Sequence, residues 1–438
     1  MSNTWSQVLA SVAPESVGRV RGVVGLSVDV VGTGAAVGDL LRLGDGPDAV
    51  TAEVVATGQS SARCMPLGSV TGLRAGMPVR PVGSGLLVPV GPGLLGRVID
   101  GLGRPLDGKG PLRDVRWVTV EGQAPHPLER ARVSAALPLG VRVLDTLVSV
   151  GQGQRIGLFA GSGVGKSTLL SMIARGTEAE VSVISLVGER GREVREFIED
   201  DLGHEGLARS VVVVATSDEP PLVRLRSAFV ATRIAEALRD EGRHAVLMMD
   251  SLTRVAMAQR EIGLSVGEPP ATRGYPPSTF SLLAQLLERA GTGPSGSVTG
   301  IYTVLVDGDD HNEPIADAAR SILDGHVVLD RKLAVANHYP AVDALGSISR
   351  VANRVITAEQ KAQAGALREI MAARAAAADL LDVGAYVTGS NPKVDTAVAH
   401  ADQIQAFLRQ ASDEPAAAAD SWQHLDDLTA LLVRGAGA

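Results

Sequence analysis

The chain has few cysteine, lysine and aromatic residues. The shortages of cysteine and of aromatic residues each exclude a way of stabilising the fold. Its 438 residues include one cysteine, Cys64, which cannot build a disulfide framework and is expected to be a small buried apolar side chain. Aromatic residues make up 3% of the chain, so the large cores allowed by 45% hydrophobic residues must be aliphatic. Of the 41 basic residues only five are lysines, at positions 109, 166, 332, 361 and 393.

The charge balance and the first residues exclude further classes. The 41 basic and 49 acidic side chains sum to −8, which argues against a surface that coats nucleic acid, although a local basic channel stays compatible with it. Residues 1–16 have no basic start and no sustained apolar run, so no signal peptide is predicted. No run approaches the ~18 apolar residues of a membrane-spanning helix. We therefore expect a cytoplasmic protein in a reducing compartment.

Composition divides the chain into parts. Residues 17–92 hold short Val- and Gly-rich runs separated by turn residues, which predicts a small β-barrel domain. In residues 93–349 apolar strand runs alternate with helical stretches, which predicts an α/β domain with a mainly parallel sheet. Residues 350–438 are Ala-rich and predicted to be helical. The opening segment, residues 1–16, carries apolar side chains at helical spacing that fit either core packing or docking of a partner helix.

A glycine-rich loop between a predicted strand and a predicted helix is the strongest chemical signal. The strand covers residues 155–159, and the helix is expected to begin near Lys166. Glycines let backbone N–H groups turn inward around phosphate oxygens, and the helix N-terminus adds partial positive charge. Lys166 would reach the β- and γ-phosphates, and the Ser167 hydroxyl would bind Mg²⁺. The predicted nucleotide-binding residues of this loop are Ala160, Gly161, Ser162, Gly163, Val164, Gly165, Lys166, Ser167 and Thr168.

One residue departs from the strict pattern of such a loop. Ala160 stands where the pattern begins with glycine. We expect alanine to be tolerated, because this first position needs small size more than a positive φ. An unrelated Gly-rich turn is the alternative, and it explains neither the flanking strand nor the Lys-Ser-Thr that opens the helix.

Two carboxylates follow later predicted strands. Asp250 ends the apolar run 245–249, where it can hold the Mg²⁺ shell beside the phosphate loop or simply cap the next helix. Glu189 follows the strand after the loop's helix and could polarise an attacking water. On spacing alone, a solvated charged helix start explains Glu189 equally well.

Eight strings of the sequence carry a resemblance to a known family. They stand at residues 96–107, 159–168, 188–193, 250–254, 267–277, 308–317, 338–343 and 347–350. Together they resemble the hexameric ATPases related to the catalytic subunits of rotary ATP synthases, in particular the flagellum-specific ATPase of the protein export apparatus and its type III secretion counterparts, and they occur in the family's order between about residues 17 and 410. The resemblance implies a P-loop NTPase (RecA-like) α/β core between an N-terminal β-barrel domain and a C-terminal helical domain.

The resemblance also implies roles for single residues. It makes Glu189 the water-activating carboxylate and Arg190 the residue that senses the γ-phosphate. Tyr339 matches the position whose ring packs on the adenine. Arg350 matches the arginine finger that a neighbouring subunit offers to the transferred phosphoryl group, although from the sequence alone it would be an ordinary surface arginine.

The implied activity is hydrolysis of ATP with Mg²⁺ in a homohexamer, which energises export of flagellar proteins through a type III secretion apparatus. The ring would sit peripherally at the inner membrane beneath an export gate. The helical C-terminal domain would contact the central stalk and cargo–chaperone complexes, and the N-terminal segment would contact the stator. That segment is short for a flagellar member, which weakens the expectation of stator regulation.

Other functions stay open or are disfavoured by particular residues. A secretion ATPase for virulence effectors uses the same chemistry, whereas the strings at 267–277 and 308–317 fit the export branch better than a rotary synthase subunit. A ring-shaped RNA translocase would need an aromatic single-strand platform, and no Phe, Tyr or Trp lies between Ser6 and Pro111. A non-hydrolysing scaffold would be expected to lack Glu189 or Arg350.

Overall fold

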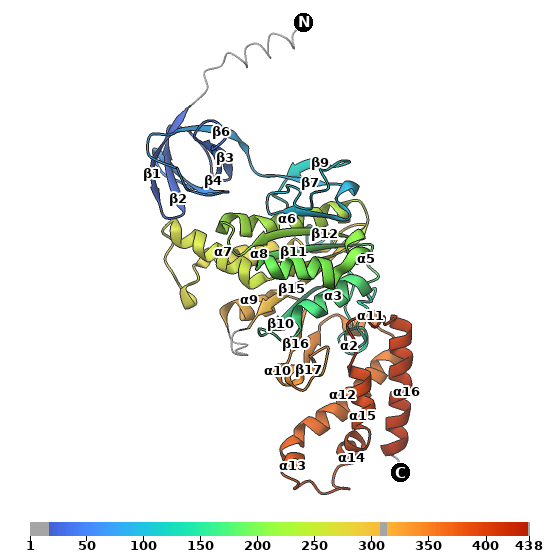
Figure 1. The fold of residues 1–438 in the computed structure, drawn as a ribbon. Coiled ribbons are helices and arrows are strands. Elements are labelled where there is room, and N and C mark those ends of the chain that lie inside the picture. Colours follow the sequence, from blue (N-terminus) through green and yellow to red (C-terminus); the bar gives the residue numbers. More distant parts are fainter. Residues whose placement is uncertain (1–16, 307–312, 437–438) are drawn as a thin grey trace.

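The computed structural model describes residues 17–306 and 313–436. The apolar stripe of residues 1–16 and the first half of the string at 308–317 (residues 308–312) lie outside the described residues. The molecule is elongated, with a barrel at one end, a helical region at the other and an α/β core between them (Figure 1). In the described part of the chain, no helix is both long and apolar enough to cross a membrane.

The N-terminal region is a closed antiparallel barrel in the order β1-β2-β5-β4-β3-β6. Alternate side chains of its strands point inward, and Val28, Leu41 and Cys64 are fully buried there. Burial raises the pKa of the Cys64 thiol to about 12, so it behaves as the inert apolar side chain expected from the sequence. The strands are β1 (Gly18–Val24), β2 (Ser27–Val31), β3 (Asp39–Leu43), β4 (Val50–Thr57), β5 (Ser61–Pro66) and β6 (Pro78–Ser84).

One run assigned to the barrel from its composition lies outside it. The strand β7 (Leu87–Val90) pairs with β9 (Arg116–Thr119) in a separate two-stranded sheet. The barrel already closes when β1 pairs with β6, which leaves no free edge for a further strand.

The α/β core is built on one extended sheet in the order β17-β16-β10-β15-β13-β11-β12-β8, with β14 added beside β15. Its pairs are parallel except for β14 with β15 and β16 with β17. The strands are β8 (Arg97–Asp100), β10 (Arg155–Ala160), β11 (Val181–Glu189), β12 (Ser210–Thr216), β13 (His244–Asp250), β14 (Gly291–Thr292), β15 (Ser297–Leu305), β16 (Gly325–Leu329) and β17 (Val342–Ser349).

Apolar clusters cover the two faces of this sheet. In β12, Val211 and Val213 belong to one cluster while Val212 and Val214 belong to the other, as expected for a strand buried on both sides. The first cluster packs against α6, α7 and α8, and the second against α3 and the C-terminal helices. The core helices are α2 (Arg142–Leu147), α3 (Lys166–Gly176), α4 (Gly191–Glu196), α5 (Gly203–Ala208), α6 (Pro221–Asp240), α7 (Leu252–Ser265), α8 (Pro277–Glu288), α9 (Pro314–Ile322) and α10 (Arg331–Val335).

The C-terminal region is helical and packs on the core through aliphatic side chains. Leu367 and Leu425 are completely buried in the cluster that also holds α3. The helix α12 (Ala358–Ala376) begins at a capping box formed by Thr357 and Gln360. The helices are α11 (Ala352–Val355), α12 (Ala358–Ala376), α13 (Ala378–Asp382), α14 (Pro392–Ala399), α15 (Ala401–Leu408) and α16 (Ala418–Ala436).

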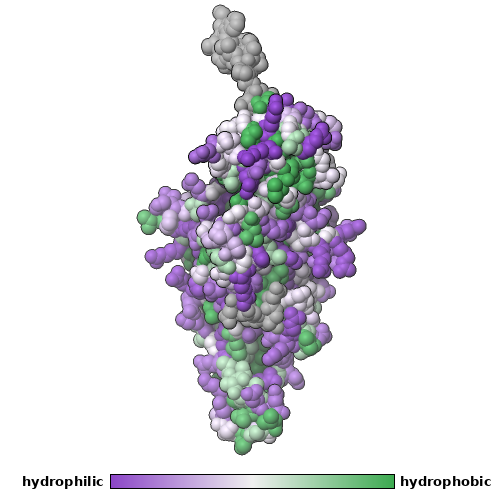
Figure 2. Space-filling view, turned by 90° about the vertical axis from the view of Figure 1, so that its left-hand side faces the viewer, coloured by the Kyte–Doolittle hydropathy of each residue, from purple (hydrophilic) through white to green (hydrophobic). Residues whose placement is uncertain are grey.

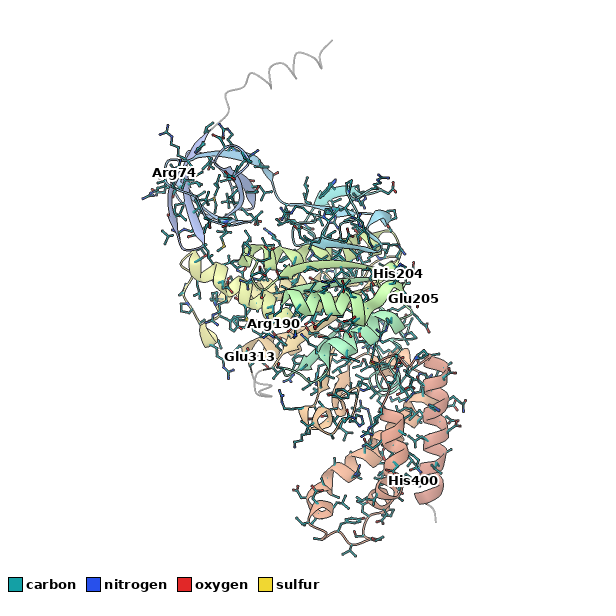
Figure 3. All side chains as sticks on the ribbon, in the orientation of Figure 1. Arg74, Arg190, His204, Glu205, Glu313 and His400 are labelled. Carbon is teal, nitrogen blue, oxygen red and sulfur yellow. The ribbon has the colours of Figure 1, made fainter. Side chains whose placement is uncertain are left out.

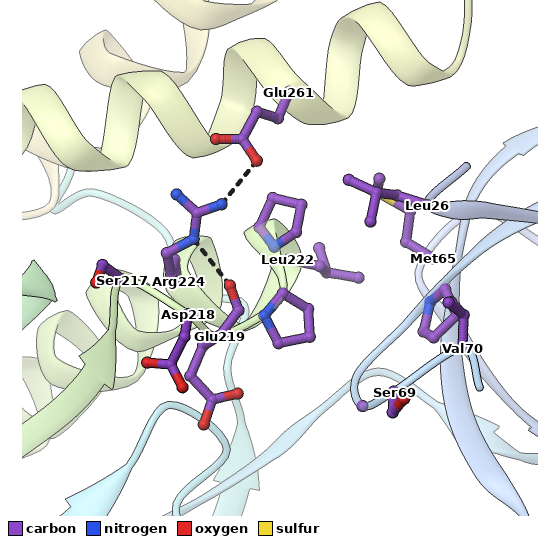
Figure 4. Close-up of a pocket in the computed structure, with 14 residues that line it drawn as sticks. Leu26, Met65, Ser69, Val70, Ser217, Asp218, Glu219, Leu222, Arg224 and Glu261 are labelled. Atoms are coloured by element: carbon purple, nitrogen blue, oxygen red, sulfur yellow. Dashed lines mark hydrogen bonds and ion pairs between the residues drawn. The ribbon is translucent and has the colours of Figure 1, made fainter. Parts of the chain in front are cut away.

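A buried ion pair links the barrel to the core, and a small cavity lies between the two. Arg226 of α6 donates from Nε to Glu53 of β4 at 2.8 Å, and both side chains are largely buried. Beside this contact a cavity of about 330 Å³ lies between the barrel and the helices α6 and α7 (Figure 4). In the lining of this cavity, Arg224 Nη2 donates a hydrogen bond to Glu261 Oε2 at 2.7 Å. The cavity wall includes Ser217, whose N–H donates to Glu189 O at 3.0 Å, so this contact region adjoins the sheet edge that carries the phosphate loop.

Candidate functional site

The phosphate loop runs from the end of β10 into the start of α3. Ala160 is buried, and its carbonyl accepts a hydrogen bond from Val306 N at 3.0 Å. Gly163 and Gly165 have φ values of 75° and 91°, a left-handed backbone that favours glycine. Gly165 directly precedes α3, so the loop turns its backbone toward the helix N-terminus, where anions are stabilised.

Lys166 is the first residue of α3 and lies between two carboxylates. Its Nζ atom is 2.5 Å from Asp250 Oδ1 and 3.6 Å from Glu189 Oε1. Burial lowers the pKa of Lys166, but Asp250 and Glu189 outweigh it and leave the pKa above its usual value. The lysine is therefore charged and is held where the phosphate chain of a nucleotide would lie.

Both carboxylates come from the ends of neighbouring parallel strands. Asp250 is the last residue of β13 and Glu189 the last of β11, and Leu186 of β11 is paired with Asp250 in register. Thr303 of β15 fixes the aspartate by donating its hydroxyl to Oδ1 at 2.7 Å. Because the carboxyl ends of parallel strands share one sheet edge, three separate strands deliver this cluster to the phosphate loop.

The pKa of Glu189 is raised at this sheet edge. Burial raises the pKa of Glu189 to about 7, and the nearby charge of Asp250 adds to the rise while Lys166 opposes it. A carboxyl that changes charge near neutral pH, at a sheet edge beside a phosphate loop, is suited to proton transfer or to orienting water.

Two arginines near the loop differ from the pattern expected from the sequence. Arg190 is exposed and pairs with Glu193 at 3.0 Å, so its guanidinium is not among the groups gathered around Lys166 (Figure 3). Arg254 of α7 was not assigned to the site from the sequence, yet its side chain lies over Gly188 and its charge acts on Glu189. Among the described residues, the buried Nε atom of Arg254 has no hydrogen-bond acceptor. Its place in the first turn of α7, shortly after the strand-end Asp250, is the signal that could have found it.

The remaining loop residues and Tyr339 lie at the sheet edge that carries the phosphate loop. Ser167 is exposed at the second position of α3, and Thr168 follows it. The Tyr339 ring lies against Gly165, where a Cβ added to the glycine would come within 3.2 Å of the ring. The tyrosine keeps 40% of its surface exposed, which leaves a ring face open beside the loop.

Arg350 lies at the opposite edge of the sheet. Its backbone N–H donates to Asp324 O at 3.0 Å, and Asp324 N donates to Arg155 O at 2.7 Å. Arg155 is the first residue of β10, whereas the phosphate loop follows the last, so the strand separates the two edges by about 17 Å. Arg350 is exposed there, and no arginine side chain spans that distance to its own phosphate loop.

The fold and these residues define a nucleoside triphosphatase of the P-loop class. A strand, a glycine-rich turn and a helix N-terminus carry the lysine, and strand-end carboxylates face it.

Comparison with known proteins identifies the branch. The nucleotide-binding domain of the ATP synthase alpha/beta family matches residues 140–349, the beta-barrel domain of that family matches residues 20–83, and the T3SS EscN ATPase C-terminal domain matches residues 356–427. A Flagellum-specific ATP synthase of Bacillus subtilis is 50% identical over 94% of this chain and 95% of its own length. A Type 3 secretion system ATPase of Xanthomonas euvesicatoria is 48% identical over 98% of both chains.

A solved structure agrees in fold over nearly the whole chain. The assembled ATPase EscN from the enteropathogenic E. coli type III secretion system superposes with a TM-score of 0.89 at 41% identity, over 94% of this chain and all of that one. The same ATPase is also known in complex with its central stalk EscO. The chain therefore belongs to the ATP synthase alpha/beta family, among its flagellum-specific and type 3 secretion ATPases, and is an ATP hydrolase. This confirms the resemblance and the fold class predicted from the sequence.

Proposed function

We propose that this chain forms a homohexameric ring that hydrolyses ATP at its subunit interfaces and energises export of flagellar proteins. The observation that carries the ring is the position of Arg350, which lies at the sheet edge opposite its own phosphate loop. An arginine that serves a nucleotide from that edge must serve the neighbour's nucleotide. The assembled state of EscN supports the same arrangement.

Within each site we propose the roles that were expected from the sequence. Lys166 and the backbone of residues 160–168 bind the phosphates, and the open face of the Tyr339 ring packs on the adenine. Glu189 orients the attacking water, for which its place beside Lys166 is suited. Arg190 reaches the γ-phosphate after leaving its surface pair with Glu193, and Arg350 of the next subunit neutralises charge that develops in the transition state.

The donor set near Lys166 fits Mg²⁺ brought in with the nucleotide. Among the described residues, the contacts of the Asp250 carboxylate are all made through Oδ1, which leaves Oδ2 for the cation shell. The Ser167 hydroxyl supplies a second hard oxygen at the start of α3. The described residues include no group of three His, Cys, Asp or Glu that could hold a metal. When bound, Mg²⁺ would neutralise phosphate charge.

The magnesium assignment predicts a change in metal requirement. Replacing Ser167 by Ala should raise the Mg²⁺ concentration for half-maximal ATP hydrolysis by roughly tenfold, because a direct oxygen ligand is lost. Ser171→Ala on the same helix is the matched control, since that hydroxyl donates to Thr168 O at 2.8 Å instead. Titration of ATPase activity with MgCl₂ at constant ATP measures the effect, and equal requirements in both variants would contradict the role of Ser167.

The raised pKa of Glu189 predicts a pH dependence. Only the ionised carboxylate can act on water, and its fraction falls as pH drops through about 7, so kcat/KM should fall about tenfold for each further pH unit. Above that pH the profile should be level. Phosphate release measured across this range tests the prediction, and a profile that stays level down to the ordinary Glu pKa of about 4.3 would contradict it.

The two ends of the molecule suit the partners that we propose. Hydrophobic side chains gather at the lower tip in Figure 2, at the end of the molecule where Figure 1 shows α13. Leu380, Val383 and Val387, in and just after α13, are exposed. We assign the stalk and cargo–chaperone contacts to this helical region, and the complex of EscN with EscO supports a stalk partner. We also propose that the ring sits peripherally at the inner membrane, beneath the export gate. The stator would bind the N-terminal segment.

The division of the chain into residues 1–16, 17–92, 93–349 and 350–438 belongs to this proposal as well.

A secretion ATPase for virulence effectors is the second candidate function, because relatives of both kinds match at similar identity. The test is replacement of the export ATPase of a flagellated bacterium by this chain. We expect secretion of hook and filament proteins to be restored, with Glu189→Gln inactive. Rescue of a virulence system alone would favour the second candidate.

A further inference from the structure

The segment that carries Tyr339 is held from the C-terminal helical region. The preceding residue, His338, is 3% exposed, and its Nδ1 atom lies 2.7 Å from Gln405 Oε1 on α15. The two residues are 67 positions apart in the chain. A contact between side chains of the core and the helical region thus lies directly beside the ring that faces the phosphate loop.

A second bond from the same end of α15 reaches Tyr339 itself. The Tyr339 carbonyl accepts a hydrogen bond from Gln410 N at 3.0 Å. The Gln410 side chain is fixed in turn, because it accepts from Arg142 N at 2.8 Å and donates to Gly140 O at 2.9 Å. The Tyr339 backbone is therefore bracketed by two contacts to residues 405–410, one through His338 and one through Gln410.

The Tyr339 ring depends on this bracket for its position. Tyr339 is 40% exposed and its ring lies against Gly165, so burial alone does not fix the side chain. Burial lowers the pKa of His338, so at neutral pH its imidazole is uncharged; with an acceptor oxygen of Gln405 opposite, Nδ1 carries the proton. Loss of that acceptor leaves a buried N–H without a partner, which favours a shift of the segment.

We infer that Gln405 is a positioning residue for the nucleotide base: through His338 it sets the place of the Tyr339 ring against which adenine packs. The inference rests on the proposed role of Tyr339. It makes the helical region a determinant of ATP affinity, although none of its helices carries a residue of the phosphate-binding cluster.

The test compares three variants of α15 in the full-length protein. Gln405→Leu keeps the size of the side chain but removes the acceptor, Gln405→Glu keeps an acceptor oxygen, and Gln403→Leu changes an exposed glutamine on the same helix. For Gln405→Leu we expect the KM for ATP to rise about threefold to tenfold. We expect kcat to stay within about twofold, because the lost contact acts on binding of the base. Gln405→Glu and Gln403→Leu should keep the wild-type KM.

A base-free inhibitor separates positioning from general damage. Inorganic tripolyphosphate has no base, so its inhibition constant should be the same in wild type and Gln405→Leu. A parallel rise of the tripolyphosphate constant and the KM for ATP would overturn the inference, since it would place the effect on the phosphate loop or on folding.

A Tyr339→Ala variant tells the two proposals apart. If Tyr339→Ala raises the KM for ATP and Gln405→Leu does not, the inference fails while the base platform stands. If Tyr339→Ala leaves the KM unchanged, the proposed role of Tyr339 itself fails. In a Tyr339→Ala background, Gln405→Leu should add no further increase.

Discussion

ATP hydrolysis is expected to fall by about 10²–10³-fold when Lys166 is replaced by Ala, because the transferred phosphoryl group loses its pre-positioned cation. The structure shows the geometry on which this depends. Lys166 Nζ lies 2.5 Å from Asp250 and 3.6 Å from Glu189, so its charge is held by two strand ends and not by solvent. Steady-state phosphate release at saturating ATP measures the loss.

A matched control for this variant lies in the C-terminal region. Lys393 also forms an ion pair, with its Nζ atom 2.6 Å from Glu369 Oε2, but both side chains are more than half exposed. Exposed pairs contribute little, so Lys393→Ala should hydrolyse ATP at the wild-type rate. Substantial turnover by Lys166→Ala would contradict the assignment of the phosphate loop as the site.

The second large effect is expected for Arg350→Ala, which should lose about 10³–10⁵-fold in kcat, the range for arginine fingers in other NTPases. Nucleotide binding and assembly should change little, because Arg350 is linked through the Asp324 backbone to Arg155, at the sheet edge opposite its own phosphate loop. Steady-state kinetics, nucleotide titration and light scattering on one preparation separate these quantities.

Arg354 provides the control for charge at the same edge. It is exposed in the short helix α11, four residues after Arg350, so Arg354→Ala removes an equal charge from the neighbourhood. We expect that variant to keep most of its activity. Normal hydrolysis by a hexameric Arg350→Ala protein would show that the finger assignment is wrong.

Much of this site could be predicted because its parts are local in sequence. The buried strands read as apolar runs, and the structure has β10 and β13 within one residue of the predicted limits. Residues at strand ends then share an edge by the geometry of a parallel sheet, which brings Glu189 and Asp250 to Lys166. The barrel and the helical region were likewise visible in composition.

Other features depend on tertiary geometry that local patterns do not carry. The pattern of the core predicts a mainly parallel sheet, yet β17 runs antiparallel to β16 after the short helix α10, and this reversal sets Arg350 at the far edge. The side-chain directions of Arg190 and Arg254 depend on packing around Gly188 and on the pair with Glu193. The bond between His338 and Gln405 joins residues far apart in the chain.

The central claim is that each catalytic site is shared between two copies of the chain, and co-expression of two inactive variants tests it directly. Lys166→Ala lacks its own phosphate lysine but still offers Arg350, whereas Arg350→Ala lacks the finger but keeps the phosphate loop. In mixed rings with random order, about one quarter of the interfaces combine an intact loop with an intact finger, because a ring interface joins two different faces. We predict ATPase activity near that fraction of wild type. Activity no higher than that of the separate variants would contradict the shared site.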